Sequence, residues 1–149
     1  MNTKRYLARN RILPILIVLG LLAYQYYLPD QQSTNNTVTV GDNAVQQAYA
    51  ARRSGLWLEI SGRVNRVLRD DNEGSRHQKF ILELDDGHTV MVAHNIDLAE
   101  RIPVRRGSAL AVRGKYEWND RGGIIHWTHH DPDGRVQGGW IMLDDVRYQ

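Results

Sequence analysis

Cysteine is absent from the sequence, so the protein can form neither a disulfide bond nor a thiolate site for catalysis or metal binding. Acidic residues are absent before Asp30, whereas the same N-terminal stretch holds four of the 19 basic residues. The other 15 basic residues face all 17 acidic ones, which gives residues 29–149 a formal charge of −2. The net charge of this part therefore shows no sign of non-specific nucleic-acid binding.

Long apolar stretches are also scarce, with one exception at residues 12–28. This stretch has 17 residues, no charge and three tyrosines near its end. Its length is at the lower limit for a helix that crosses a bilayer, and tyrosine is common at the membrane interface. Because the basic residues precede it, the positive-inside rule puts residues 1–11 in the cytoplasm and residues 29–149 outside, in the periplasm if the cell is Gram-negative. We predict a single-pass anchor in the cytoplasmic (inner) membrane; a cleaved signal peptide is the alternative, although no small-residue cleavage site follows.

The part beyond the apolar stretch divides into three segments. Residues 29–41 are polar and predict a tether. Residues 42–55 predict a short helix that Asp42 caps and that ends near Gly55. Residues 56–149 predict a β domain, because apolar and polar residues alternate there. The expected strands cover 57–68, 80–84, 89–93, 108–119, 122–130 and 140–146.

The β domain is predicted to be a small closed barrel. Its expected strands are short, two of them contain a glycine in the middle (Gly62 and Gly114), and one helical turn is expected within residues 96–107. Among small barrels the OB-fold is the best match, and a β-sandwich is the alternative. Such barrels bind oligonucleotides or oligosaccharides and some are enzymes, so the predicted fold does not decide the function.

Four motifs in the β domain are distinctive: HQKFIL (77–82), AHNIDLAERIP (93–103), GKYEWNDRGGIIHWTHHDPDGR (114–135) and GGWI (138–141). In these motifs the chain resembles an uncharacterised bacterial family, catalogued as domain of unknown function 3465. The chain departs from that pattern at Ser108, where the family has Asp, and at Val136, where it has His. The resemblance implies a small β domain behind an export segment. It implies no activity, so the chemistry must be argued from the residues.

Histidine is concentrated in the string IIHWTHHDPDGR, which holds three of the six histidines. Imidazole and carboxylate are common ligands of zinc and other divalent metals. If the segment stays extended, His126 and His130 share one face, while His129 and Asp131 share the other. We therefore expect His126 and His130 to form a site with His94, with a divalent metal such as zinc as the candidate cofactor. The alternative is a polar turn in which Asp131 accepts hydrogen bonds from backbone amides.

Further residues are candidate contacts for a substrate or ligand. Glu117 is a candidate general base and Asn119 a residue that orients water or substrate; the alternative is a strand edge and a turn. His77 and His88 are interpreted as structural or surface residues. The candidate ligand-binding residues can stack on a ring, clamp an anion or donate a hydrogen bond: Asn95, Arg101, Arg121 and Trp127. The alternatives are a capping role for Asn95, solvated arginines and a core tryptophan.

Two functions from different classes are compatible with these residues. The first is a phosphodiester hydrolase resembling a nuclease, in which a metal or a neutral histidine activates water. Its candidate catalytic residues are His94, Glu117, Asn119, His126 and His130. Neither the His-Glu-x-x-His motif of zinc proteases nor the His-x-His-x-Asp-His motif of metallo-β-lactamases is present. The alternative is a noncatalytic, membrane-tethered module that binds an oligosaccharide, an oligonucleotide or an envelope protein.

Overall fold

The structure is a computed structural model that describes residues 39–41 and 43–149. The predicted cytoplasmic segment, the membrane anchor and residues 29–38 of the tether lie outside the described residues, as does the predicted cap Asp42. Within the described part, no helix has the length and apolar character needed to cross a membrane.

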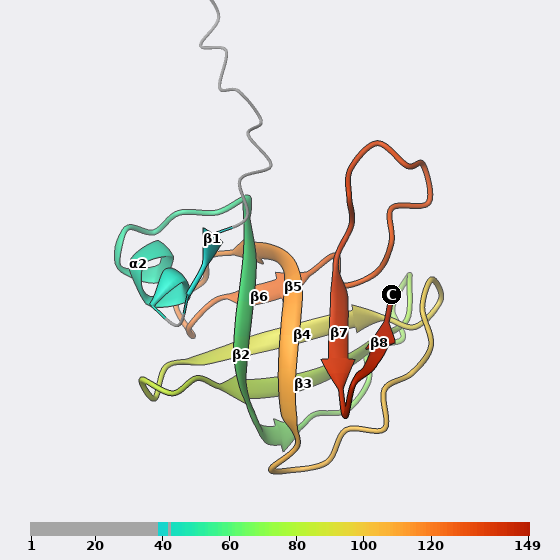
Figure 1. Ribbon diagram of the computed structural model, residues 1–149, viewed down its shortest axis with the longest axis horizontal. Coiled ribbons are helices and arrows are strands. Elements are labelled where there is room, and N and C mark those ends of the chain that lie inside the picture. The colour runs from blue at the N-terminus through green and yellow to red at the C-terminus, as the bar shows by residue number, and fades with distance from the viewer. Residues whose placement is uncertain (1–38, 42) are drawn as a thin grey trace, which may run out of the picture. The chain divides into compact units, whose positions relative to one another are not determined.

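The described chain consists of strands and one short helix (Figure 1). The elements in chain order are β1 (Thr39–Val40), α2 (Ala44–Ala50), β2 (Leu56–Val67), β3 (His77–Glu83), β4 (Thr89–Asn95), β5 (Ala109–Glu117), β6 (Ile124–His126), β7 (Trp140–Leu143) and β8 (Val146–Tyr148). The helix α2 lies within the range where the sequence predicted one.

Five strands close into a barrel. The order of the sheet is β1-β2-β3-β4-β6-β5-β7-β8, and the additional pairing of β2 with β5 closes the ring. The barrel is mixed, because β4 and β6 run parallel while the other barrel pairs are antiparallel. A mainly β protein with a small closed barrel was the prediction, and the structure confirms it.

The long strand β2 pairs with two different strands and thereby closes the barrel. Its first part, up to Arg63, pairs with β5, and its last part pairs with β3. At the change of partner Gly62 is tightly enclosed, since a Cβ there would lie 2.5 Å from the carbonyl oxygen of Glu83. A register irregularity between Val64 and Arg66 follows directly. A glycine and a bulge together allow a strand to bend from one partner to the next.

The core lies inside the barrel and results from the alternation of buried and less buried side chains along the strands. In β3 and β4, for example, Phe80, Leu82, Val90 and Val92 are fully buried, while their neighbours Ile81 and Met91 face outward and are half-buried. Burying an apolar side chain of this size contributes about 1.5–3 kcal/mol, so a one-residue shift of register would be strongly unfavourable. The pattern therefore fixes which side chains are available on the outer face.

Three expected elements differ from the observed ones. The strand expected over 122–130 ends at His126, because Trp127 adopts a positive φ of 55° and turns the chain. The strand expected over 140–146 is the hairpin β7–β8, with Asp144 and Asp145 in the left-handed region that type I′ turns require. The end of the predicted tether forms β1, which pairs in parallel with β2. The expected helical turn is present in outline, since the Ala99 amide donates to the Asn95 carbonyl over 3.2 Å.

Candidate functional site

A groove of about 810 Å³ crosses the outer face of the barrel. We call it the groove; its floor is apolar and contains Leu68, Ile81 and Met91. Arg66, from the end of β2, and Arg121, from the β5–β6 loop, lie on opposite sides of the β3–β4 pair and also line it. The cavity thus combines an apolar floor with two guanidinium groups and the carboxylate of Asp120, which suits a ligand with apolar parts and polar or anionic groups.

The loop that carries Arg121 is held by hydrogen bonds. The Asn119 Oδ1 accepts from the amides of Arg121, at 2.9 Å, and Gly123, at 3.0 Å. The His88 Nε2 donates to the Gly122 carbonyl over 2.9 Å. Asn119 is therefore a turn residue, as the alternative interpretation had it, and one wall of the groove is fixed before any ligand binds.

A second cavity, of about 330 Å³, lies at the opposite end of β3 and β4. We call it the histidine cavity, because His77, His126 and His129 line it together with Asn95 and Trp127. His77 is directly opposite Asn95 in the β3–β4 ladder. His129 reaches the same cavity as His126 because the chain turns at Trp127, which ends the alternation expected from an extended segment.

Two of these histidines have a defined tautomer. The His77 Nδ1 lies 2.8 Å from the Ser75 carbonyl and the His129 Nδ1 lies 2.7 Å from the His130 carbonyl. A carbonyl oxygen only accepts, so Nδ1 carries the proton in both rings, and Nε2 has a free lone pair when the ring is neutral. The Trp127 ring stacks on that of His129, with centroids 5.7 Å apart. Both histidines are thus oriented groups that can accept a proton.

His126 lies beside a carboxylate. Its Nε2 is 3.7 Å from the Glu117 Oε1, and this nitrogen is buried without a hydrogen-bond partner among the described residues. Burial lowers the pKa of His126, and the nearby Glu117 opposes this shift. The ring is therefore mainly neutral at pH 7. Of the residues predicted to be catalytic, these two are the pair that the structure brings together.

The family model described as "Protein of unknown function (DUF3465)" matches residues 30–149. The chain belongs to this family. Among curated proteins no match was found. The resemblance inferred from the four sequence motifs is confirmed, and the match includes the groove and the histidine cavity of this DUF3465 protein.

The placement of His94 contradicts a shared site with His126 and His130. His94 is fully buried. Its Nε2 donates to the Glu100 carbonyl over 3.0 Å, and its Nδ1 accepts from the Thr128 hydroxyl at 2.8 Å. Burial lowers its pKa, so the ring stays neutral. With both nitrogens occupied inside the barrel, His94 cannot ligate a metal or reach a substrate without breaking these bonds.

The third histidine of the predicted metal site of this DUF3465 protein is His130. His130 is exposed and lies outside the histidine cavity, because the turn after His126 sends it to solvent. In residues 39–41 and 43–149 no group of three or more histidine, aspartate or glutamate side chains is arranged to hold a metal ion. Asp131 instead accepts from the amides of Asp133, Arg135 and Val136, and these bonds lower its pKa. The alternative interpretation of Asp131 as a turn residue is confirmed.

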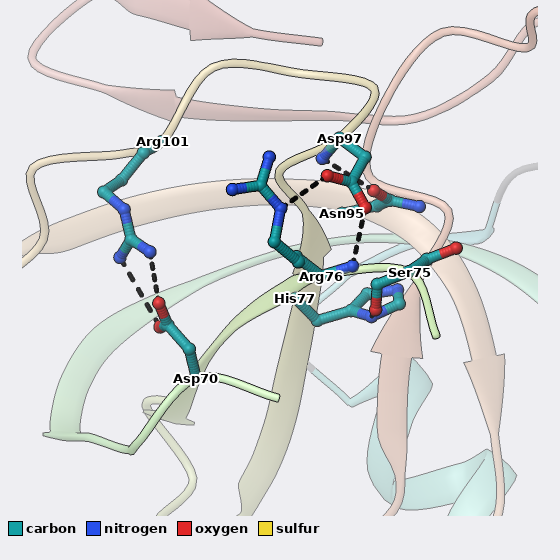
Figure 2. Close-up of polar contacts among 7 residues, drawn as sticks. All are labelled: Asp70, Ser75, Arg76, His77, Asn95, Asp97 and Arg101. Carbon is teal, nitrogen blue, oxygen red and sulfur yellow. Dashed lines mark hydrogen bonds and ion pairs between the residues drawn. The ribbon is translucent and has the colours of Figure 1, made fainter. Parts of the chain in front are cut away.

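Arg101 is not a free anion clamp, since its guanidinium pairs with the carboxylate of Asp70 (Figure 2). Arg76 pairs in a similar way with Asp97, at 2.7 Å, next to the turn that begins at Asn95. The Asn95 side chain accepts from the Asp97 amide over 2.9 Å, so it caps this turn and lines the histidine cavity as well. Of the two arginines predicted to bind ligand, Arg121 alone faces a cavity without a carboxylate partner among the described residues.

The sequence analysis did not predict the apolar floor of the groove, nor three of the basic residues in these cavities. His77 and His129 were given structural roles, and Arg66 was not singled out. The position of His77 could have been predicted from the sequence, because extending the hairpin ladder from the Asp86-Gly87 turn places His77 opposite Asn95. His129 depends on the left-handed Trp127, and no residue preference of tryptophan signals that conformation.

Proposed function

We propose that this DUF3465 protein is a binding module of the OB type, whose groove holds a short extended oligomer. The parallel pairing of β4 with β6, the third and fifth strands of the barrel, supports the OB type. The groove lies over β3 and β4, between the residues that follow β2 and the β5–β6 loop. OB-folds bind oligonucleotides and oligosaccharides on the face of their second and third strands, between the corresponding loops. The position and lining of the groove carry the proposal.

A binding role is favoured over catalysis because the predicted catalytic residues are dispersed. His94 is inside the barrel, Asn119 holds a turn and His130 points to solvent. The groove, in contrast, has adjoining apolar side chains on its floor, since Ile81 is opposite Met91 and both line it. Adjacent strands are about 4.8 Å apart, so these two side chains lie next to each other across the face.

The test is a titration of the full-length protein with fluorescent single-stranded oligonucleotides and with neutral oligosaccharides. We expect saturable binding of one class, and about a tenfold higher Kd for Met91→Ala, because truncating a side chain at a ligand contact removes about 1–2 kcal/mol of apolar burial. Met142→Ala is the matched control: Met142 is also a half-buried strand methionine, but it lies on β7 and outside the groove. Absence of saturable binding would refute the binding module, and equal Kd values for both variants would refute the groove as its site.

A second candidate, phosphodiester hydrolysis, is favoured by the Glu117–His126 pair. A neutral histidine beside a carboxylate can act as a general base, and His77 and His129 in the same cavity offer free Nε2 lone pairs. We expect His126→Ala to abolish any cleavage of DNA, RNA or a small phosphodiester by the full-length protein. His130→Ala, a change at an exposed histidine outside the cavity, should preserve it. Absence of cleavage, or equal loss in both variants, would reject this candidate.

We further propose that residues 12–28 anchor the domain at the outer face of the cytoplasmic membrane. The four basic residues before this stretch and its uncharged composition support this location. A C-terminal alkaline phosphatase fusion, which is active outside the cytoplasm, should be active and should sediment with membranes. An inactive fusion would reverse the proposed orientation.

A further inference from the structure

Four arginines gather at one end of the barrel, beside the groove. We call Arg63, Arg66, Arg105 and Arg106 the arginine cluster. The first two lie near the end of β2, and the other two lie in the connection between β4 and β5. All four are exposed.

Backbone hydrogen bonds fix the two segments of the cluster side by side. The Gly107 amide donates to the Val64 carbonyl over 2.8 Å, and the Val64 amide donates to the Ser108 carbonyl over 2.9 Å. The Ser108 hydroxyl also accepts from the Arg105 amide at 3.1 Å. The cluster is therefore built on a rigid part of the barrel, although its members are about 40 residues apart in the sequence.

These guanidinium groups have no carboxylate partner within the described part of the chain. The sole polar contact of a cluster side chain there is from the Arg63 Nη1 to the Gly107 carbonyl, at 3.4 Å. Other exposed arginines do have such partners, as Arg76 has Asp97 and Arg101 has Asp70. Four unpaired cations in one place repel one another, and an anionic ligand would relieve that repulsion.

The cluster is continuous with the groove. Arg66 lines both the groove and a hollow of about 580 Å³ that also contacts Arg105 and Arg106. Arg63 and Arg106 line another hollow, of about 350 Å³. Glu83 and Asp85 line this second hollow too, and their negative charges oppose an anionic ligand there; Glu83 accepts from the Asn65 side-chain amide over 2.5 Å. An extended ligand in the groove would thus pass beside several guanidinium groups in succession.

We propose that the ligand of the groove is a single-stranded nucleic acid, whose backbone phosphates bind the arginine cluster while its bases lie on Ile81 and Met91. This inference rests on the proposed binding function. Guanidinium groups bind phosphate in a bidentate manner, and OB-folds bind oligonucleotides on the face of their second and third strands. The balanced net charge of the domain hides the cluster, because acidic residues elsewhere offset it.

An anionic membrane surface is less compatible with the geometry. Thr39 is opposite Leu58 in β2, eight positions before Arg66. At about 3.3 Å per residue, the chain that leads from the proposed anchor joins the barrel about 26 Å from the arginine cluster along this strand. The groove is also concave, which suits a thin flexible chain better than a flat bilayer.

The test is the salt dependence of binding between the full-length protein and a fluorescent oligothymidylate. For single strands the slope of log K against log salt changes by about 0.7 for each phosphate contact. The double variant Arg105→Gln/Arg106→Gln should therefore reduce the slope by about 1.4, which corresponds to about a 25-fold weaker binding at 0.1 M salt. The matched control Arg53→Gln/Arg147→Gln removes the same charge from exposed arginines outside the cluster, and its slope should equal that of the unchanged protein.

The outcomes separate this inference from the proposed function. A slope that is equal in the cluster variant and the control variant would overturn the inference. Binding of a neutral oligosaccharide without binding of oligothymidylate would also overturn the inference, but the proposed binding function would stand. If neither ligand binds, the inference and the proposed binding function are both refuted. Binding to vesicles that contain anionic lipid, lost in the cluster variant and unaccompanied by oligothymidylate binding, would assign the cluster to a membrane instead. Because all four positions are exposed, equal melting temperatures are expected and will verify that the variants fold.

Discussion

Replacing His94 with alanine tests whether this histidine is structural or functional. The ring is fully buried and joins two segments, through the Glu100 carbonyl in the β4–β5 connection and the Thr128 hydroxyl after β6. Alanine would leave the buried Thr128 hydroxyl and the Glu100 carbonyl without these partners and would open a cavity. His94 therefore links two segments of the barrel, and its replacement should lower the free energy of unfolding.

The expected loss is about 2–4 kcal/mol of unfolding free energy. A buried polar group that loses its partner costs about 1–3 kcal/mol, and the missing ring adds a cavity term of similar size that relaxation reduces. For a domain of this size about 4 °C of melting temperature corresponds to each kcal/mol, so we expect a decrease of about 8–16 °C. Thr128→Val, which removes the hydroxyl and keeps the shape of the side chain, should cost less, about 1–2 kcal/mol.

The assay is denaturant unfolding of both single variants and of the double variant, monitored by tryptophan fluorescence. A double-mutant cycle should give a coupling free energy between His94 and Thr128 of at least about 0.5 kcal/mol, as expected for side chains in direct contact. His130→Ala is the control, and it should change stability by less than about 0.5 kcal/mol because the residue is exposed. A normal melting temperature for His94→Ala together with a selective loss of ligand binding or cleavage would refute the structural role.

The neutral state of His94 also makes the stability of the protein depend on pH. Burial lowers the pKa of His94, so the unfolded chain binds a proton here more readily than the folded protein. The stabilisation is therefore complete above the unfolded value of about 6.5 and is lost as the pH falls below it, by at most about 1.4 kcal/mol per pH unit. His94→Gln should flatten the decline of stability between pH 7 and pH 5. An unchanged decline would show that His94 does not cause it.

Three further predictions concern the loops and the core. Gly123→Ala should destabilise the protein by more than about 2 kcal/mol in chemical unfolding, because a Cβ there would lie 2.2 Å from the Tyr116 ring. Gly134 also has a positive φ but lies in open space, so Gly134→Ala should cost about 1 kcal/mol. Equal losses of stability in the two variants would contradict the packing argument. Asp131→Ala should increase amide hydrogen exchange in residues 131–136, because the side chain accepts hydrogen bonds from this segment. These bonds lower the pKa of Asp131 in the folded protein, so the stability that they contribute should be lost as the pH falls below the ordinary value of 3.8. Burial raises the pKa of Tyr116 to about 12, so stability should fall above pH 10 and Tyr116→Phe should reduce this fall; an identical alkaline melting profile would argue against it.

The barrel could be predicted from the sequence because its determinants are local. Alternation of apolar and polar residues defines the strands, the Asp86-Gly87 pair defines the β3–β4 hairpin, and Gly62 marks the bend of β2. Each of these signals acts over a few residues, and burial on a single face enforces the register. The closure itself followed from the number and length of the strands.

The sites were harder to predict because they depend on pairings between distant segments. A strand that continues from the Gly122-Gly123 turn to His130 would place His129 on the face opposite His126. The left-handed backbone at Trp127 instead turns His129 towards the cavity of His126 and His130 towards solvent. The interior position of His94 follows the alternation of β4, since Val90, Val92 and His94 are all buried, but its hydrogen-bond partners at Glu100 and Thr128 lie on other segments. The arginine cluster requires the contact between Val64 and Gly107, which no local pattern reveals.

The pairing of β2 with β5 also has a kinetic consequence. The nearest pair in this seam joins Arg63 to Ala109, whereas the β3–β4 hairpin begins with Glu83 opposite Thr89. Closing the longer loop costs about 2 kcal/mol more chain entropy than closing the hairpin, so the seam should form late in folding. The groove takes one wall from the end of β2, which pairs with β3, and the other from the β5–β6 loop, which β6 brings beside β4. Neither wall is part of the seam, so a protein whose barrel has opened along the seam would still present the groove, and a bound ligand would not slow that opening.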